Sequence, residues 1–191
     1  MPSKYKVYNN DRAYFMTITV VHWIDLFTRS KYEQIMVDAL AYCQRHKGLE
    51  IFGWCLMSNH LHLIARAADG HDLAMIIRDF KKYTAKALIR QIQTGTEGRR
   101  EWLLTAFRKA CLHLRRDQQF KVWRTGYHAI ELFSNKFIYQ KLEYIHANPV
   151  RAQYVAFPED YLYSSARNYA GLSTVMDVDC LPAEMRTVAG S

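Results

Sequence analysis

Two histidines stand two positions apart at His60 and His62, with Leu61 between them. On a β-strand, residues two apart point to the same face and the residue between them points to the other. The two imidazoles would therefore lie side by side while Leu61 enters the core. Neutral imidazoles on a rigid strand can hold a divalent metal ion. The pattern predicts a two-histidine metal site, and the alternative is a pair of surface histidines without a ligand.

A tyrosine with polar neighbours, Tyr144, lies in a segment with helical spacing. With 100° per residue and Tyr144 at zero, Asn148 falls at about 40°, Lys141 at about 60° and Gln140 at about −40°. Tyr144 thus shares a polar face that borders the apolar stripe of the same helix. We expect its hydroxyl to stay accessible, although an ordinary amphipathic tyrosine with a wet tip has the same pattern. The apolar stripe consists of Ile138, Leu142 and Ile145.

Runs of β-branched and aromatic residues predict the strands that must carry these groups. The spacing of apolar residues predicts helices between the strands, with Ser30, Asp72 and Ser134 at their N-termini; the first of these belongs to a capping box. Pro149 should end the last helix near Asn148, because proline disfavours helical geometry in the residue before it. The expected strands span residues 14–21, 50–57, 60–66 and 122–132.

This order of elements predicts an α+β protein of the ferredoxin-like, split β-α-β class, with a four-stranded antiparallel sheet packed with helices. We expect one domain over residues 1–171, with an inserted basic helical segment at about 94–121 and a C-terminal tail at 172–191. Such folds host many functions, so the class alone decides none of them.

Positive charge is concentrated in one part of the chain, which has a net charge of +8 overall. Between Arg78 and Lys121, twelve basic residues stand against four acidic ones, so this segment alone accounts for the excess. A local basic excess suits a polyanion such as DNA, and a solvated helix face is the ordinary alternative. The 13 tyrosines add surface for stacking on unpaired bases. The candidate DNA-binding residues are Arg78, Lys81, Lys82, Lys86, Arg90, Arg99, Arg100, Arg108, Lys109, Arg115 and Arg116.

The remaining composition bears on the cell compartment. The four cysteines, Cys43, Cys55, Cys111 and Cys180, form no C-x-x-C pair, which favours buried thiols in a reducing compartment over a disulfide framework. No apolar run approaches the ~20 residues of a membrane helix, and residues 1–10 lack the apolar stretch of a secretory signal. We therefore expect a cytoplasmic protein with no membrane partner.

Three segments resemble a known family when they are taken in order along the chain. Residues 56–64 (LMSNHLHLI) resemble the His-hydrophobic-His segment of the single-tyrosine transposases, which belong to the HUH superfamily of single-strand DNA endonucleases. Residues 144–152 (YIHANPVRA) resemble the Tyr-Ile-x-x-Asn-Pro-Val segment of the REP-associated tyrosine transposases, and residues 157–165 (FPEDYLYSS) are similar to the stretch that follows it there. Asn148 matches the REP-associated branch, since the insertion-sequence branch usually has Gln at this position. The segment 94–121 is longer than in compact members.

The resemblance implies a metal-dependent endonuclease and strand transferase that acts on single-stranded DNA with a hairpin. It implies that Tyr144 attacks the phosphodiester and forms a 5′-phosphotyrosine, and that His60, His62 and Asn148 hold Mg²⁺ or Mn²⁺. Lys141, His146 or a water are the alternatives for the general base. Both a monomer and a homodimer remain open.

Two other functions compete with this one. The chain could be a non-catalytic nucleic-acid-binding module that keeps the fold and its basic helices. It could also be a structural ferredoxin-like domain whose basic face is solvated surface. The four residues His60, His62, Tyr144 and Asn148 favour the enzyme, because a binding module has no need to keep all of them.

Overall fold

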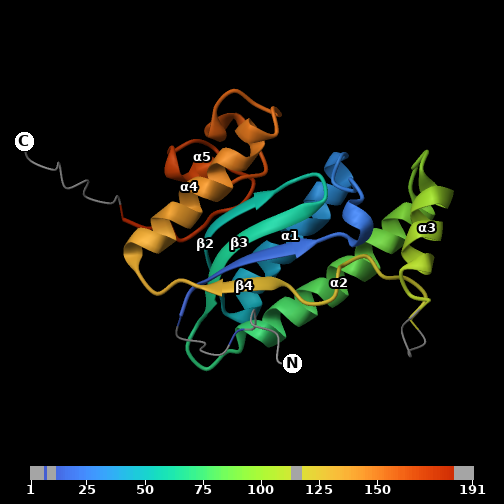
Figure 1. Cartoon of the computed structure of the whole chain (residues 1–191), viewed down its shortest axis with the longest axis horizontal. Coiled ribbons are helices and arrows are strands. Elements are labelled where there is room, and N and C mark those ends of the chain that lie inside the picture. The colour runs from blue at the N-terminus through green and yellow to red at the C-terminus, as the bar shows by residue number, and fades with distance from the viewer. Residues whose placement is uncertain (1–6, 8–11, 113–117, 183–191) are drawn as a thin grey trace, which may run out of the picture.

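A four-stranded antiparallel sheet in the order β2-β3-β1-β4 forms the centre of the molecule. The computed structural model describes residues 7, 12–112 and 118–182. This strand order, with helices on both faces of the sheet (Figure 1), confirms the predicted α+β, ferredoxin-like class. The strands are β1 (Tyr14–Thr19), β2 (Leu49–Leu56), β3 (His60–Ala67) and β4 (His128–Glu131).

Different helices cover the two faces of the sheet. Helices α1 (Ser30–Lys47) and α2 (Leu73–Thr94) pack on one face, and α4 (Asn135–Arg151) packs on the other. Each face therefore has its own apolar core. The smaller elements are η1 (Val21–Trp23), α3 (Arg100–Lys109), η2 (Pro158–Asp160) and α5 (Ala166–Tyr169).

The alternation of side chains along β3 places the two histidines on the α4 face. Leu61 and Leu63 are fully buried in the core under α1 and α2, whereas Ile64 packs in the second core with Leu142 and Ile145 of α4. Since residues two apart share a face, His60 and His62 lie on the same side as Ile64. The predicted division between the histidines and Leu61 is confirmed.

A glycine in β2 lets α4 approach the sheet closely. A Cβ atom added at Gly53 would stand 2.6 Å from Cδ1 of Leu142 and 3.1 Å from Cδ1 of Ile145. Any other residue here would have to displace the ends of these two side chains. Gly53 therefore leaves room for the apolar side chains of α4 on this face of the sheet.

The helix starts agree only partly with the sequence. Asp72 and Ser134 cap α2 and α4 as predicted, with their side chains accepting backbone N–H bonds. The capping box at Ser30 is wrong: Ser30 is the first helical residue, and the preceding Arg29 makes no side-chain cap. Glu33, the other member of that motif, is instead hydrogen-bonded to Tyr163.

The bounds of three elements differ from the prediction by two residues or more, the first being β1, which ends at Thr19 instead of Val21. The fourth strand is only His128–Glu131, because a turn with Gly126 at φ 73° separates it from Trp123, which forms an isolated bridge with Val20. Helix α4 continues through Pro149 to Arg151 instead of ending near Asn148. A proline two residues before the helix end removes a single backbone bond, and Pro149 is buried there.

The inserted segment and the tail also take part in the fold. Within 94–121 the structure places the short helix α3, against α2, and residues 113–117 lie outside the described part. In the tail, Met176 is buried and the backbone N–H of Asp179 donates to Ile51 O. Cys43, Cys55 and Cys111 are buried as expected, whereas Cys180 is exposed. None of the described helices is apolar over a length that would span a bilayer.

Candidate active site

His60 and His62 face each other through their Nε2 atoms, which are 3.1 Å apart. The other ring nitrogen of each histidine has its own partner. His60 Nδ1 lies 2.6 Å from Asn59 Oδ1, and His62 Nδ1 lies 3.0 Å from the Thr17 hydroxyl. Because an amide oxygen only accepts, His60 donates from Nδ1 and leaves the lone pair of its Nε2 toward His62.

The charge state of the pair favours a cation between the two rings. Burial lowers the pKa of His60 and lowers that of His62 to about 3, where the neighbouring His60 and Lys141 charges add to the effect. Both imidazoles are therefore neutral near pH 7. Two ligand atoms each about 2.1 Å from one ion are about 3 Å apart when they take adjacent octahedral positions. The Nε2 separation fits such a pair of ligands.

His62 is more deeply placed than its sequence indicates. Only 4% of the residue is exposed, and its ring stacks on Phe15 with centroids 5.4 Å apart. His62 is therefore not a surface histidine, and a substitution there would disturb its packing on Phe15. The reason is tertiary, since α4 covers this face of the sheet. His60 is only half-buried.

Tyr144 lies directly against the histidine pair. Its ring meets His62 edge-on at 5.6 Å between centroids and meets Phe15 at 6.0 Å, while 38% of the residue stays exposed. Helix α4 thus brings the predicted nucleophile, some 80 residues away along the chain, to the start of β3. The accessible position predicted from the helical wheel is confirmed.

Two cations flank the Tyr144 ring. The Nζ atom of Lys141 lies 5.6 Å from the ring centroid, and the Arg151 guanidinium carbon lies 5.4 Å from it. The sequence interpretation missed Arg151. The helical wheel contained the signal, because seven residues after Tyr144 correspond to about −20° on the same face. Both positive charges therefore lie close to the Tyr144 ring.

The third predicted ligand, Asn148, is one turn further along α4. Its amide nitrogen donates to the Tyr144 carbonyl oxygen at 2.9 Å, which leaves the amide oxygen as the atom that can bind a cation. Within the described residues, no cluster of three or more His, Cys, Asp and Glu side chains is placed to hold a metal. Asn148 therefore stays a prediction as the third protein ligand.

His146, one alternative for the general base, has a structural role. Its Nε2 atom lies 2.8 Å from the Ser165 hydroxyl, and its ring packs on Tyr169 at 5.3 Å. Burial lowers its pKa to about 4. It stands about 200° from Tyr144 on the helix. Of the two residues considered as base, only Lys141 is beside the nucleophile.

A hydrogen-bond network that the sequence did not reveal holds Asn59, the hydrogen-bond partner of His60. The Asp25 carboxylate accepts bonds from Ser58 Oγ at 2.6 Å and from Asn59 Nδ2 at 2.9 Å. Tyr154 donates to Ser58 at 3.0 Å. This network fixes the Asn59 amide, whose oxygen in turn orients the His60 ring.

The predicted DNA-binding residues of α2 lie across the sheet from Tyr144. Lys82, Lys86 and Arg90 are exposed, and Arg78 is exposed but paired with Asp79. Lys81 is engaged within the chain, because its Nζ atom donates to the carbonyl oxygens of Arg124 and Gly126; burial lowers its pKa to about 8.

The basic residues of the inserted segment differ in whether they are engaged within the chain or exposed. Arg99 donates to Asp25 O at 2.8 Å, Arg100 donates to Ile92 O at 3.1 Å, and Arg108 stacks over the Phe120 ring. Lys109 is exposed. The last two candidates, Arg115 and Arg116, lie outside the described residues.

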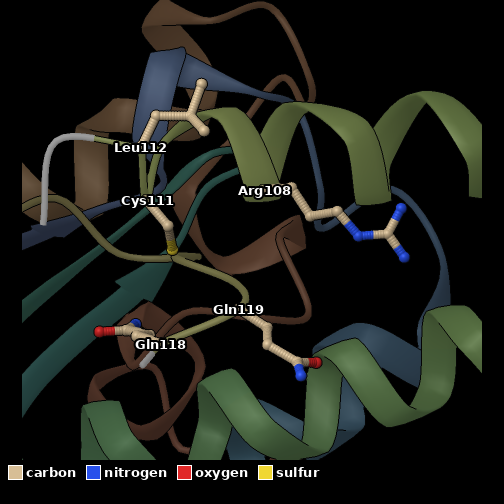
Figure 2. A pocket seen from close by; sticks show the side chains of 5 residues that line it. All are labelled: Arg108, Cys111, Leu112, Gln118 and Gln119. Carbon is tan, nitrogen blue, oxygen red and sulfur yellow. The ribbon is translucent and has the colours of Figure 1, made fainter. Parts of the chain in front are cut away.

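A surface hollow of about 340 Å³ lies beyond the end of α3 (Figure 2). It is lined by Arg108, Cys111, Leu112, Gln118 and Gln119. None of these residues contributes to the histidine pair or to its network. The chemistry described above is therefore separate from this hollow.

Comparison with known proteins gives a family match and a fold match. Residues 14–105 match the family described as "Transposase IS200 like". This stretch includes His60 and His62 and ends before Tyr144. No curated protein matches the chain.

Among solved structures, a REP-associated tyrosine transposase bound to a REP hairpin has a TM-score of 0.64 and 20% sequence identity, covering 99% of this chain and 100% of that one. A protein of Deinococcus radiodurans named as a candidate transposase has a TM-score of 0.41 and 17% identity, covering 76% and 95%. Residues 14–105 thus match the IS200-like transposase family, and the chain shares its fold along almost its whole length with the REP-associated tyrosine transposase.

Proposed function

We propose that the protein is a metal-dependent single-strand DNA endonuclease and strand transferase with Tyr144 as its nucleophile. The observation that carries the proposal is the contact of the Tyr144 ring with His62, whose Nε2 atom faces that of His60. The structural neighbour is bound to a REP hairpin, which supports hairpin-flanked DNA as the substrate.

The reaction consists of two transesterifications. The Tyr144 oxygen attacks a DNA phosphorus, the bond from phosphorus to the 3′ oxygen breaks, and the 3′ oxygen leaves with a proton as a hydroxyl. The product is a 5′-phosphotyrosine. A 3′-hydroxyl of DNA then attacks this phosphorus and releases Tyr144. Each step exchanges one phosphoester for another, so no ATP is consumed.

The residues around Tyr144 have distinct tasks in this scheme. His60, His62 and Asn148 would hold Mg²⁺ or Mn²⁺, which supplies charge stabilisation at a non-bridging phosphate oxygen. Lys141 and Arg151, whose charges lie close to the Tyr144 ring, would attract the phosphate. The network from Asp25 to Asn59 keeps the lone pair of His60 Nε2 directed into the site.

The proposal predicts a covalent product in a simple assay. The protein is incubated with end-labelled single strands that carry a hairpin and unpaired flanks, with Mn²⁺, and run on a denaturing gel. We expect a labelled band at the mass of protein plus DNA, and its loss with a chelator. Retarded DNA on a native gel without any covalent band would instead support the non-catalytic binding module.

The basic residues of α2 provide a second test, which concerns DNA affinity. Lys82 and Lys86 are exposed, and each phosphate contact on a single strand contributes about −0.7 to the slope of log affinity against log salt. Changing both to Glu should weaken binding and flatten the slope by about 1.4. Adduct formation at saturating DNA should persist, because these residues lie across the sheet from Tyr144.

The matched control is the pair Arg45→Glu and Lys136→Glu, which changes the net charge equally at exposed positions on other helices. Equal slopes for wild type and the α2 variant would exclude this face as a DNA contact. A change of oligomeric state in light scattering, with an unchanged slope, would assign it to a protein interface.

A further inference from the structure

An exposed tryptophan lies beside His60 on a stretch of left-handed backbone. We propose that Trp23, with Arg124 over its ring, is a stacking site for one unpaired DNA base next to the scissile phosphate. This inference rests on the proposed function, because it names how the substrate strand is held at that same site.

The backbone turns Trp23 outward. His22 and Trp23 have φ values of 56° and 55°, a region that residues other than glycine rarely adopt. Their neighbours Val21 and Ile24 are buried, yet 56% of Trp23 is exposed. Non-glycine residues in this conformation persist only where the surrounding structure holds them, and they gather at functional sites.

Hydrogen bonds hold this turn onto the candidate active site. The backbone N–H of Val20 donates to Asn59 O at 2.9 Å, and the Asn59 side chain donates to Trp23 O at 3.4 Å. The Trp23 and His60 rings meet edge-on with centroids 6.1 Å apart. Trp23 and His60 are therefore placed by the same residue, Asn59.

Arg124 adds a positive charge on the same platform. Its guanidinium carbon lies 5.5 Å from the Trp23 ring centroid. Its backbone is fixed at both ends, because its N–H donates to Thr19 O and its carbonyl accepts from Lys81. Lys81 thus serves this site indirectly, as a positioning residue for Arg124.

The chemistry of the platform fits a single-stranded nucleic acid. A flat indole stacks on any unpaired base, and a neighbouring guanidinium binds the phosphate that follows it. Paired bases inside a duplex offer no free face. Because the Trp23 ring meets the His60 ring, a base stacked on Trp23 would lie next to the histidine pair.

The chain offers a matched control in Trp102, which is also 56% exposed but lies on the regular helix α3. We would measure fluorescence anisotropy with a labelled DNA hairpin that has unpaired flanks, and in parallel with a blunt duplex. Trp23→Ala should weaken binding of the flanked hairpin about 5- to 100-fold, while Trp23→Phe restores most of it and Trp102→Ala changes it little. Binding of the blunt duplex should be equal in all four proteins.

Abasic sites placed one at a time in the flanks locate the base. At one position, loss of the base should weaken binding by wild type but not by Trp23→Ala. If Trp23→Ala is disturbed in its circular dichroism spectrum, Trp23→Gly replaces it, since glycine accepts this φ without strain.

The outcomes separate the two proposals. If wild type forms the covalent adduct and Trp23→Ala binds the flanked hairpin as wild type does, the stacking site is wrong and the proposed function stands. If all four proteins bind the duplex and the flanked hairpin equally, the stacking site is likewise excluded. If wild type binds neither DNA, both proposals fall.

Discussion

Replacing Tyr144 with phenylalanine will abolish the covalent protein–DNA adduct while DNA affinity stays within about twofold of wild type. The substitution removes one oxygen and keeps the ring, so the contacts with His62 and Phe15 and the positions of Lys141 and Arg151 are preserved. The measurement is the covalent band on a denaturing gel, together with anisotropy at matched salt.

Three other tyrosines serve as controls for this result. Tyr83 is exposed on α2, across the sheet, and Tyr139 donates its hydroxyl to the Pro182 carbonyl oxygen. Tyr154 is the sharpest control, because its hydroxyl reaches the network below His60 through Ser58. Each Tyr→Phe variant at these positions should keep the adduct. A labelled peptide containing any of them, obtained from the Tyr144→Phe protein, would overturn the assignment of Tyr144.

Local periodicity was enough to predict the orientation of the key side chains. The two-residue repeat of a strand separated His60 and His62 from Leu61, and the helical wheel put Tyr144 beside the apolar stripe. These features follow from the geometry of a single element. For the same reason the position of Arg151 beside Tyr144 could have been predicted from the sequence, by continuing the helical wheel for two more turns.

Features that depend on two elements were beyond the sequence. His62 is buried because α4 returns to cover β3, and the missing side chain of Gly53 on β2 leaves room for Leu142 and Ile145 of that helix. His146 is not placed to act as the base, because the segment with Ser165, 19 residues later, folds back so that the Ser165 hydroxyl contacts the His146 ring. No local pattern in the chain reports such contacts.

The turn at Trp23 shows a different limit of prediction from the sequence. The run from Tyr14 to Val21 is typical of a strand, but β1 ends at Thr19 and the chain enters two left-handed residues soon after. Such φ values are expected of Gly or Asn, and neither His22 nor Trp23 suggests them. Here the tertiary packing of Val21 and Ile24 overrides local preference.

His60→Ala will reduce adduct formation at least about 100-fold without unfolding the protein, because a bound cation supplies several kcal/mol of stabilisation to a reacting phosphate. His60 is the better variant to test, since it is half-buried, whereas His62 is stacked on Phe15 and bonded to Thr17. His62→Ala should have the same effect on the adduct and should also lower the free energy of unfolding by about 1–3 kcal/mol. Electron paramagnetic resonance of free Mn²⁺ in titrations measures metal binding independently of activity, and both variants should bind less of the ion.

His46→Ala, at an exposed position of α1 on the opposite side of the sheet, should match wild type in every assay. If His60→Ala forms the adduct at the wild-type rate and binds Mn²⁺ equally well, the histidine pair does not hold the metal.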